Sequence, residues 1–178
     1  MVGPHRPRPD KRNGVLPHDG TFLLDYGCGV GRIPKELIRR FGCAVLGLDI
    51  SQSMRQLAPG YVGDSRFACC GWPIANALIG RGLQVDGVFA VWSLQHSPRI
   101  ADDIDLIRRI LKPAGKLFVC NLYHFAVPTN KGWTDLDLDI RTLLADAFET
   151  ISVEGISREH TNESIAANAF LGCYRKRP

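Results

Sequence analysis

The chain has 178 residues, of which 45% are hydrophobic and 22% are charged, and these values are ordinary for one globular domain with its own core. The net charge of +4 comes from the two ends of the chain. Residues 1–20 hold four basic and two acidic side chains, and residues 175–178 hold three basic ones. The residues between them hold 15 basic and 16 acidic side chains. This distribution argues against a broad nucleic-acid-binding face, and no apolar run approaches the ~20 residues of a membrane-spanning helix.

Residues 1–20 contain four prolines and little that could pack, so we expect a flexible leader there and one folded domain over residues 21–178. The leader has no apolar stretch of the kind that secretory signals contain. Six cysteines lack metal-ligand spacing and fall mostly within predicted strands, namely Cys28, Cys43, Cys69, Cys70, Cys120 and Cys173. Buried cysteine acts as a small hydrophobe, so we expect free thiols, no metal and a cytoplasmic location.

The first predicted strand, Thr21–Tyr26, runs directly into a glycine-rich turn. Glycines on alternate positions allow a tight turn and a backbone against which a ligand can lie, and they are Gly27, Gly29 and Gly31. The predicted helix that follows, with apolar residues on one face up to Phe41, points free N–H groups at that ligand. Asp25 precedes the turn, and its carboxylate would repel a pyrophosphate but attract an ammonium or sulfonium group.

A dinucleotide-binding turn has a different glycine pattern, G-x-G-x-x-G/A. Counted from Gly27, its last small residue would stand where this chain has Arg32, and the third glycine comes one position earlier, at Gly31. Arg32 and Asp25 therefore both disfavour the alternative of an NAD(P)-dependent oxidoreductase.

The second predicted strand, Cys43–Asp49, is continuously apolar before it ends on an acid, 24 residues after Asp25. A carboxylate at this place can accept hydrogen bonds from both hydroxyls of a ribose. The alternative is that Asp49 caps the next helix, which we expect to begin after Ser51 and to end at residues 59–60, a Pro-Gly pair.

The remaining predicted elements alternate between strands and helices. They are a weak strand at Arg66–Cys70, a helix at Ile74–Ile79, a strand at Val85–Trp92, a helix at Asp102–Leu111, a strand at Lys116–Leu122, a helix at Asp135–Ala147 capped by Thr134, and closing strands at Phe148–Ile156 and Ala167–Arg175. This alternation predicts an α/β fold with right-handed crossovers. The glycine turn, Ser51, residues 93–96 and residues 123–124 all follow strand ends, so they should meet in one cleft.

Residues 23–31 resemble the first motif of the class I S-adenosylmethionine-dependent methyltransferases, apolar-apolar-Asp/Glu-x-Gly-x-Gly-x-Gly. The resemblance extends from about Thr21 to Arg177 and is greatest to the small-molecule branch that includes ubiquinone- and menaquinone-biosynthesis enzymes. It implies a Rossmann-like three-layer α/β/α sandwich, with a mostly parallel seven-stranded sheet and an antiparallel last strand. It also implies S-adenosylmethionine as cofactor, a small-molecule or carrier-bound acceptor and no metal.

The resemblance further implies the cofactor contacts. Asp25 would place the methionine end, although it could instead accept N–H bonds from the glycine turn, and Asp49 would bind the ribose, with Ile50 against the adenine. The family's third motif normally offers an acid to the adenine amine, but residues 67–73 contain none. Stacking on Trp72 would replace that contact, unless Trp72 belongs to the core.

Residues 91–96 resemble the fourth motif, which passes beneath the transferable methyl and so assigns Ser93 to the cofactor. His96, Tyr123 and His124 are expected on the acceptor side, where His96 could also be purely structural and loop polarity could explain the other two. The missing third-motif acid leaves a non-catalytic binding or scaffold subunit as an alternative. No amphipathic helix is predicted before the first strand or directly after Leu122, so the cleft should be covered by the acceptor, by a second copy or partner subunit, or by the leader.

Overall fold

The computed structural model of this chain describes residues 17–124, 127–129, 132–134, 139–159 and 161–178. Most of the predicted leader, residues 1–16, lies outside this part. Seven of the described strands form one sheet: β1 Phe22–Tyr26, β2 Ala44–Leu48, β3 Phe67–Cys70, β4 Val85–Val91, β5 Leu111–Leu122, β8 Glu149–Gly155 and β9 Ala169–Arg175. The helices are α1 Arg32–Phe41, α2 Gln52–Val62, α3 Trp72–Gly80, α4 Ile100–Ile110, α5 Ile140–Ala147 and α6 Glu163–Asn168, with a 3-10 turn, η1, at Leu94–His96.

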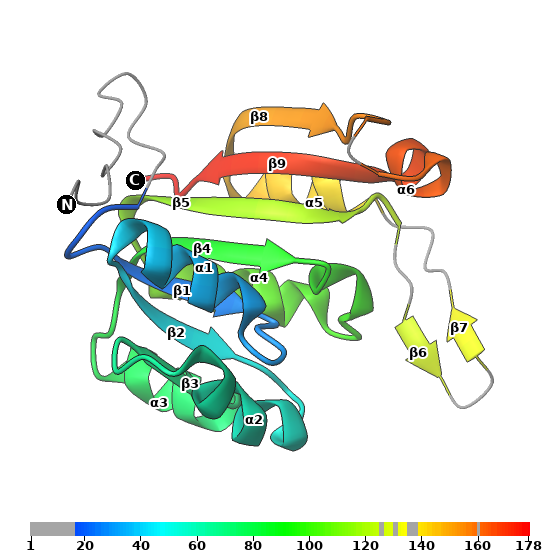
Figure 1. Cartoon of the computed structure of the whole chain (residues 1–178). Coiled ribbons are helices and arrows are strands. Elements are labelled where there is room, and N and C mark those ends of the chain that lie inside the picture. Colours follow the sequence, from blue (N-terminus) through cyan, green and yellow to red (C-terminus); the bar gives the residue numbers. More distant parts are fainter. Residues whose placement is uncertain (1–16, 125–126, 130–131, 135–138, 160) are drawn as a thin grey trace, which may run out of the picture.

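The strand order across the sheet is β3-β2-β1-β4-β5-β9-β8 (Figure 1). Neighbouring strands from β3 to β5 are parallel, whereas β9 runs antiparallel to both β5 and β8. The prediction of a mostly parallel seven-stranded sheet with an antiparallel last strand is therefore confirmed. A separate hairpin of β6 (Val127–Thr129) and β7 (Gly132–Thr134) stands away from the sheet beyond the end of β5 (Figure 1).

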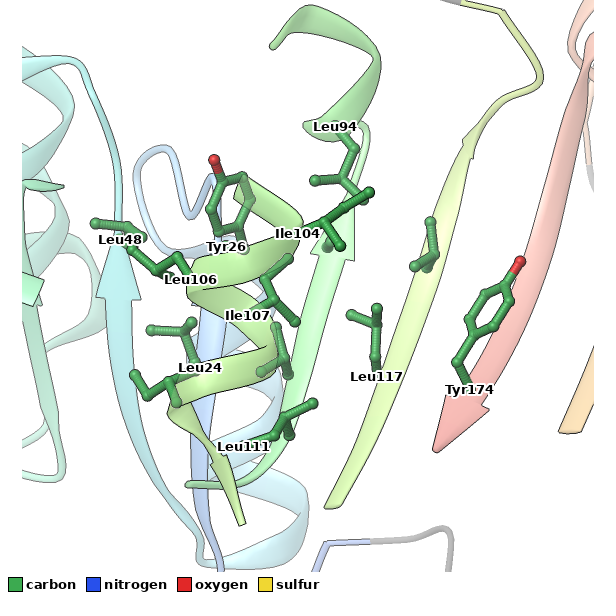
Figure 2. Packing of buried hydrophobic residues seen from close by; sticks show 14 of the residues in the cluster. Leu24, Tyr26, Leu48, Leu94, Ile104, Leu106, Ile107, Leu111, Leu117 and Tyr174 are labelled. Atoms are coloured by element: carbon green, nitrogen blue, oxygen red, sulfur yellow. The ribbon is translucent and has the colours of Figure 1, made fainter. Parts of the chain in front are cut away.

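Helices lie on both faces of the sheet, so the three-layer arrangement is also confirmed. On one face, α1 and α2 cover β1 to β3, with Leu37, Ile38 and Val62 packed against the strand residues. On the other face, α3, α4 and α5 lie behind the sheet in Figure 1. Figure 2 shows α4 directing Ile104 and Ile107 onto the larger of the two apolar clusters. None of the described helices is long and apolar enough to cross a membrane.

Helix α2 continues past Pro59 to Val62, so the prediction that it ends at residues 59–60 was wrong. Proline has no N–H to donate to the carbonyl four residues earlier, and in a helix interior this normally leaves that carbonyl without a partner. Here the carbonyl is that of Arg55, and the thiol of Cys69 on β3 donates to it over 3.2 Å. The neighbouring strand thus replaces the missing backbone hydrogen bond, and α2 ends at Gly63 instead, whose φ is +67°.

Other boundaries were also wrong. Helix α4 begins at Ile100, two residues before the prediction, and β5 begins at Leu111 because the segment before Lys116 keeps strand pairing through a register shift against β4. Helix α5 begins only at Ile140, and its cap is Asp139 rather than Thr134. Helix α6 was not predicted at all.

The hydrogen bond between Cys69 and the Arg55 carbonyl leads to a prediction about stability. Cys69→Ala should lower the free energy of unfolding by about 1 kcal/mol, since it leaves that carbonyl without its donor. In a Pro59→Ala background the same substitution should cost clearly less, because the alanine amide can donate to the carbonyl. Urea denaturation of the two single variants and the double variant measures this coupling, with Cys173→Ala as a control at another half-buried cysteine. Equal costs in both backgrounds would show that the thiol does not support the helix.

Candidate functional site

A cavity of about 290 Å³ opens at the carboxyl ends of the parallel strands. Its walls come from the ends of β1, β2 and β4, from the start of α3 and from the segment between β4 and α4. Six residues that the sequence assigned to the site line it: Gly27, Asp49, Ile50, Trp72, Ser93 and His96. The cavity therefore lies at the edge of the sheet where the sequence analysis expected the site, and this edge is the one expected for ligands in parallel α/β folds.

The three glycines of the turn differ in what surrounds them. A Cβ atom on Gly27 would lie 2.4 Å from the Cβ of Ser93, so this glycine lets the turn pack directly on the end of β4. A Cβ atom on Gly31 would lie 2.5 Å from Val62 and would push α2 away from the start of α1. Gly29 has a φ of +52° and no atom within 4 Å of the place where a Cβ would be. The backbone at Gly29 is therefore open to close approach by a ligand.

Asp49 joins the glycine turn to the loop after β2. Its Oδ2 accepts a hydrogen bond from the Gly29 amide at 2.8 Å, and its Oδ1 accepts one from the Ser51 amide at 2.8 Å. The N-cap of α2 is Ser51, whose side chain accepts from the Met54 amide, so Asp49 supports the start of this helix only from outside, through the Ser51 amide. Each carboxylate oxygen keeps a lone pair beyond these bonds. Because Asp49 lines the cavity, it can also accept from a ligand hydroxyl.

Arg55 holds the same loop from the other side. Its Nη1 donates to the carbonyls of Asp49 and Ile50 at 2.7 and 2.8 Å. A Cβ atom on Gly71, at the end of β3, would lie 3.3 Å from the Cζ of Arg55, so the missing side chain there leaves room for the guanidinium. The side chain of Ile50 is consequently presented to solvent at the cavity wall, and it is 82% exposed.

Asp25 lies beneath the glycine turn and is only 2% exposed. Its Oδ2 is buried without a hydrogen-bond partner in the described structure. Burial, followed by the nearby negative charge of Asp49, raises the pKa of this carboxyl to about 7. A cation at the turn would favour the ionised form, which is the behaviour expected of a carboxylate that places a positively charged ligand group.

Ser93 and His96 follow β4 on the far side of the turn. The Oγ of Ser93 is buried, and within the described residues it has no hydrogen-bond partner. Gln95 accepts from the Leu122 amide through Oε1 at 3.0 Å, so its Nε2 is the donor toward His96 Nε2 at 3.3 Å. The side chain of Gln95 thus fixes His96 relative to the end of β5.

Five predicted site residues are not part of the cavity wall: Asp25, Gly29, Gly31, Tyr123 and His124. The ring of Tyr123 stacks on Phe170 at 5.7 Å, and the guanidinium of Arg141 lies 4.1 Å from its centroid. These contacts hold Tyr123 against the core on the α5 side of the sheet. His124 is exposed. The structure brings neither residue together with His96.

The sequence analysis missed seven residues that do line the cavity: Tyr26, Leu48, Trp92, Ser97, Pro98, Arg99 and Asp103. Trp92 has a φ of +53°, a conformation that is strained for a bulky side chain and that often marks functional sites. Its side chain is 37% exposed. Ser97, Arg99 and Asp103 come from the turn into α4, a segment in which the sequence pattern indicated only a helix start.

The profile of the methyltransferase domain family matches residues 24–119, which is more than half of the chain. The chain belongs to this family. The resemblance to class I S-adenosylmethionine-dependent methyltransferases, which the glycine turn and the later motifs indicated, is thereby confirmed.

Similar proteins agree with this assignment. A demethylmenaquinone methyltransferase of Tropheryma whipplei is 31% identical over 150 residues, which cover 82% of this chain and 59% of that protein. The chain thus spans about three fifths of that curated relative. A methyltransferase from Haloferax volcanii, solved in complex with its activator Trm112, superimposes with a TM-score of 0.69 at 17% identity over 91% of this chain and 85% of that one.

A third similar structure contains the cofactor. It is the phosphoethanolamine N-methyltransferase 2 of Haemonchus contortus in complex with S-adenosyl-L-methionine, with a TM-score of 0.65 at 17% identity over 90% of this chain and 50% of that one. At such identities these two solved structures show the fold.

The buried carboxyl of Asp25 leads to a prediction about pH. Because its pKa is higher in the folded state than in the unfolded chain, the folded protein binds the extra proton, and this group makes stability fall as the pH rises from about 4 to about 7. Asp25→Asn should remove that fall and raise the free energy of unfolding at pH 8 by about 1–3 kcal/mol. Urea denaturation at pH 5 and pH 8 measures both effects. A variant less stable than wild type at pH 8 would contradict the assignment of a buried, unpartnered charge.

A second prediction concerns the ribose. Asp49→Ala should weaken the binding of S-adenosylhomocysteine about 30- to 1,000-fold, since it removes charge-assisted hydrogen bonds worth about 2–4 kcal/mol. Isothermal titration calorimetry measures the affinity. Asp64→Ala, which removes an acid paired with Arg66 on the surface, is the control and should bind normally. Unchanged binding by Asp49→Ala would discard the assignment.

Proposed function

We propose that this chain binds S-adenosylmethionine in the cavity at the carboxyl edge of the sheet and transfers its methyl group to a small-molecule or carrier-bound acceptor. The observation that carries the proposal is the bond between Asp49 and the Gly29 amide. It places a carboxylate with free lone pairs beside an open glycine turn, at the wall of one cavity. This arrangement suits a nucleoside whose other end is positively charged, because Asp25, whose Oδ2 has no partner among the described residues, precedes the same turn.

The bound cofactor would supply a sulfonium methyl that a nucleophile can attack in line. The contribution of the chain is then binding and orientation. Asp49 would hold the ribose, Ile50 and Trp72 would contact the adenine, and the turn with Asp25 would hold the methionine end. Ser93 would lie beside the methionine end as well, since it packs on Gly27.

His96 is the residue we assign to the acceptor side of the cavity. With Nε2 accepting from Gln95, the neutral ring carries its proton on Nδ1. The role of His96 is then to orient the acceptor rather than to take its proton through Nε2. Tyr123 and His124 were predicted for the same side, and both remain proposals that their alanine variants can test through methyl transfer.

The acceptor class follows from the relatives. A menaquinone precursor is the acceptor named for the Tropheryma whipplei enzyme, so an electron-rich ring is the first class to test. A second copy or a partner subunit would complete the cover of the cavity. The Haloferax volcanii protein was solved in complex with its activator Trm112. All six cysteines are unpaired, in keeping with a cytoplasmic location.

The test begins with the ligand. The purified protein should release S-adenosylmethionine or S-adenosylhomocysteine on denaturation, detected by mass spectrometry, and should bind S-adenosylhomocysteine but not NADH in calorimetry. Radioactive methyl transfer to a panel of quinols, phenols and amines then identifies the acceptor. Preferred binding of NADH would favour the oxidoreductase, and tight cofactor binding without transfer to any acceptor would favour the scaffold subunit.

A glycine variant provides the matched control. Gly29→Val should remain folded, with a loss of about 1–2 kcal/mol from its positive φ, but should lose S-adenosylhomocysteine binding at least about 100-fold. Gly82→Val carries the same strain, since Gly82 has a φ of +88° and open space around it, but it lies in the turn between α3 and β4. It should bind normally. Equal binding by the two variants would show that the cofactor does not cross the glycine turn.

A further inference from the structure

Asp103 is a buried acid that none of the roles above uses. It lies in the first turn of α4, is only 4% exposed and lines the same cavity as Asp49. Its neighbour Asp102 has a side chain that is 63% exposed and pairs with Arg99 at 3.8 Å on the surface. Asp102 can thus provide the negative charge that a helix N-terminus favours. The helix dipole therefore does not explain why a second acid faces the cavity.

The surroundings of Asp103 are polar and fixed. The side chains of Ser97 and Tyr26 neighbour its carboxylate and lower its pKa, whereas burial, the largest effect, raises the pKa and the charge of Asp102 adds to that rise. Tyr26 in turn meets Trp72 edge to face, with ring centroids 6.3 Å apart. Figure 2 shows Tyr26 at the top of the packed strands with its hydroxyl directed away from Leu24 and Ile107. The carboxylate thus lies in the cavity wall beside two hydroxyl groups and has acceptor capacity for a ligand.

Directly after β3, where the family's third motif would contact the adenine, the described residues include no carboxylate. Gly71 stands at the end of β3, and the space beside it is taken by the guanidinium of Arg55, which can only donate. An exocyclic amine is also a donor, so it would find no partner side chain there. Among the described residues that line the cavity, only Asp49 and Asp103 carry carboxylates. Since Asp49 is bound to the glycine turn and placed at the ribose, Asp103 remains for the base.

We propose that Asp103 accepts a hydrogen bond from the exocyclic amine of the adenine, so that α4 supplies the acid that is absent after β3. Trp72 then forms the wall against which the base lies, and Tyr26 and Ser97 orient the carboxylate. This inference rests on the proposed function, because it names the part of the cofactor that the cavity floor recognises. It makes Asp103 the residue that distinguishes adenine from bases without an amine donor.

The experiment compares two ligands that differ at this edge of the base, where inosine has a carbonyl oxygen and an N1–H group in place of the amine and the acceptor N1 of adenine. S-adenosylhomocysteine presents an amine, whereas S-inosylhomocysteine presents a carbonyl oxygen, which would face the Asp103 carboxylate. The wild-type protein should prefer the adenine compound at least about 10-fold in calorimetry. Asp103→Asn should lose about 10- to 100-fold in affinity for the adenine compound and little for the inosine compound, because an amide can donate to the carbonyl. Asp102→Asn, one residue away, should leave both affinities unchanged.

Several outcomes would overturn the inference. Equal affinity of the wild-type protein for the two ligands would by itself overturn the inference. This measurement does not depend on the folding of any variant. An equal loss of both ligands in Asp103→Asn, with a lowered melting temperature, would show that the acid only supports the structure. Failure of the wild-type protein to bind S-adenosylhomocysteine would overturn the proposed function together with this inference. Binding with unchanged discrimination in Asp103→Asn would overturn this inference alone.

Discussion

The hydrogen bonds of one carboxylate set the geometry on which the site depends. Asp49 at the end of β2 accepts from Gly29 with one oxygen and from Ser51 with the other, both at 2.8 Å. Because β1 and β2 are parallel neighbours, the loops that follow them leave the sheet side by side, and this carboxylate joins them. Arg55 donates to the carbonyls of Asp49 and Ile50 and so fixes the backbone of the loop that carries this carboxylate. The cavity wall is therefore built before any ligand arrives, so a ligand need not provide the free energy of ordering it.

The strand order explains why the cavity lies where it does. From β1 the chain moves outward to β2 and β3, and it then returns to place β4 on the other side of β1. Loops that leave β1 and β4 consequently diverge, and a cleft forms between them. The cleft requires close packing at its base, which Gly27 provides by letting the turn touch Ser93. Directly before Ser93 stands Trp92, whose positive φ turns the chain out of β4. The contact between Gly27 and Ser93 and the positive φ of Trp92 therefore both belong to the place where the chain turns out of β4 at the cavity wall.

The sequence predicted the fold because its signals are local. Apolar runs, glycines and helix-end residues determine where each helix or strand begins and ends. The parallel arrangement of the strands follows from the alternation of strands and helices. The errors came from contacts between elements. Proline in a helix normally ends it, and only the position of Cys69 on β3 lets α2 continue past Pro59. The errors in the site also came from contacts between elements. Strand ends predict which residues reach the edge of the sheet but not where their side chains point. Tyr123 follows β5 as expected, yet it stacks on Phe170. Asp103 has the spacing of a buried helix face, three and four residues from Leu106 and Ile107, but an acid there gave no reason to expect a cavity.

Three carboxylates of this edge illustrate how one residue type can serve different ends of a ligand. Asp25 is buried with its Oδ2 unpartnered among the described residues, Asp49 is bound by two amides, and Asp103 lies beside two hydroxyl groups. Two amide donors fix the direction of a carboxylate, which suits a contact with neutral hydroxyls. An unpartnered buried carboxylate is costly until a cation arrives, and the repulsion between Asp25 and Asp49 adds to that cost. A ligand with a positive group near the glycine turn would relieve both, whereas a neutral nucleoside would relieve neither. Under the proposed function, the electrostatics of this edge would therefore select for the charged end of the cofactor, while Asp49 and Asp103 would select for the nucleoside.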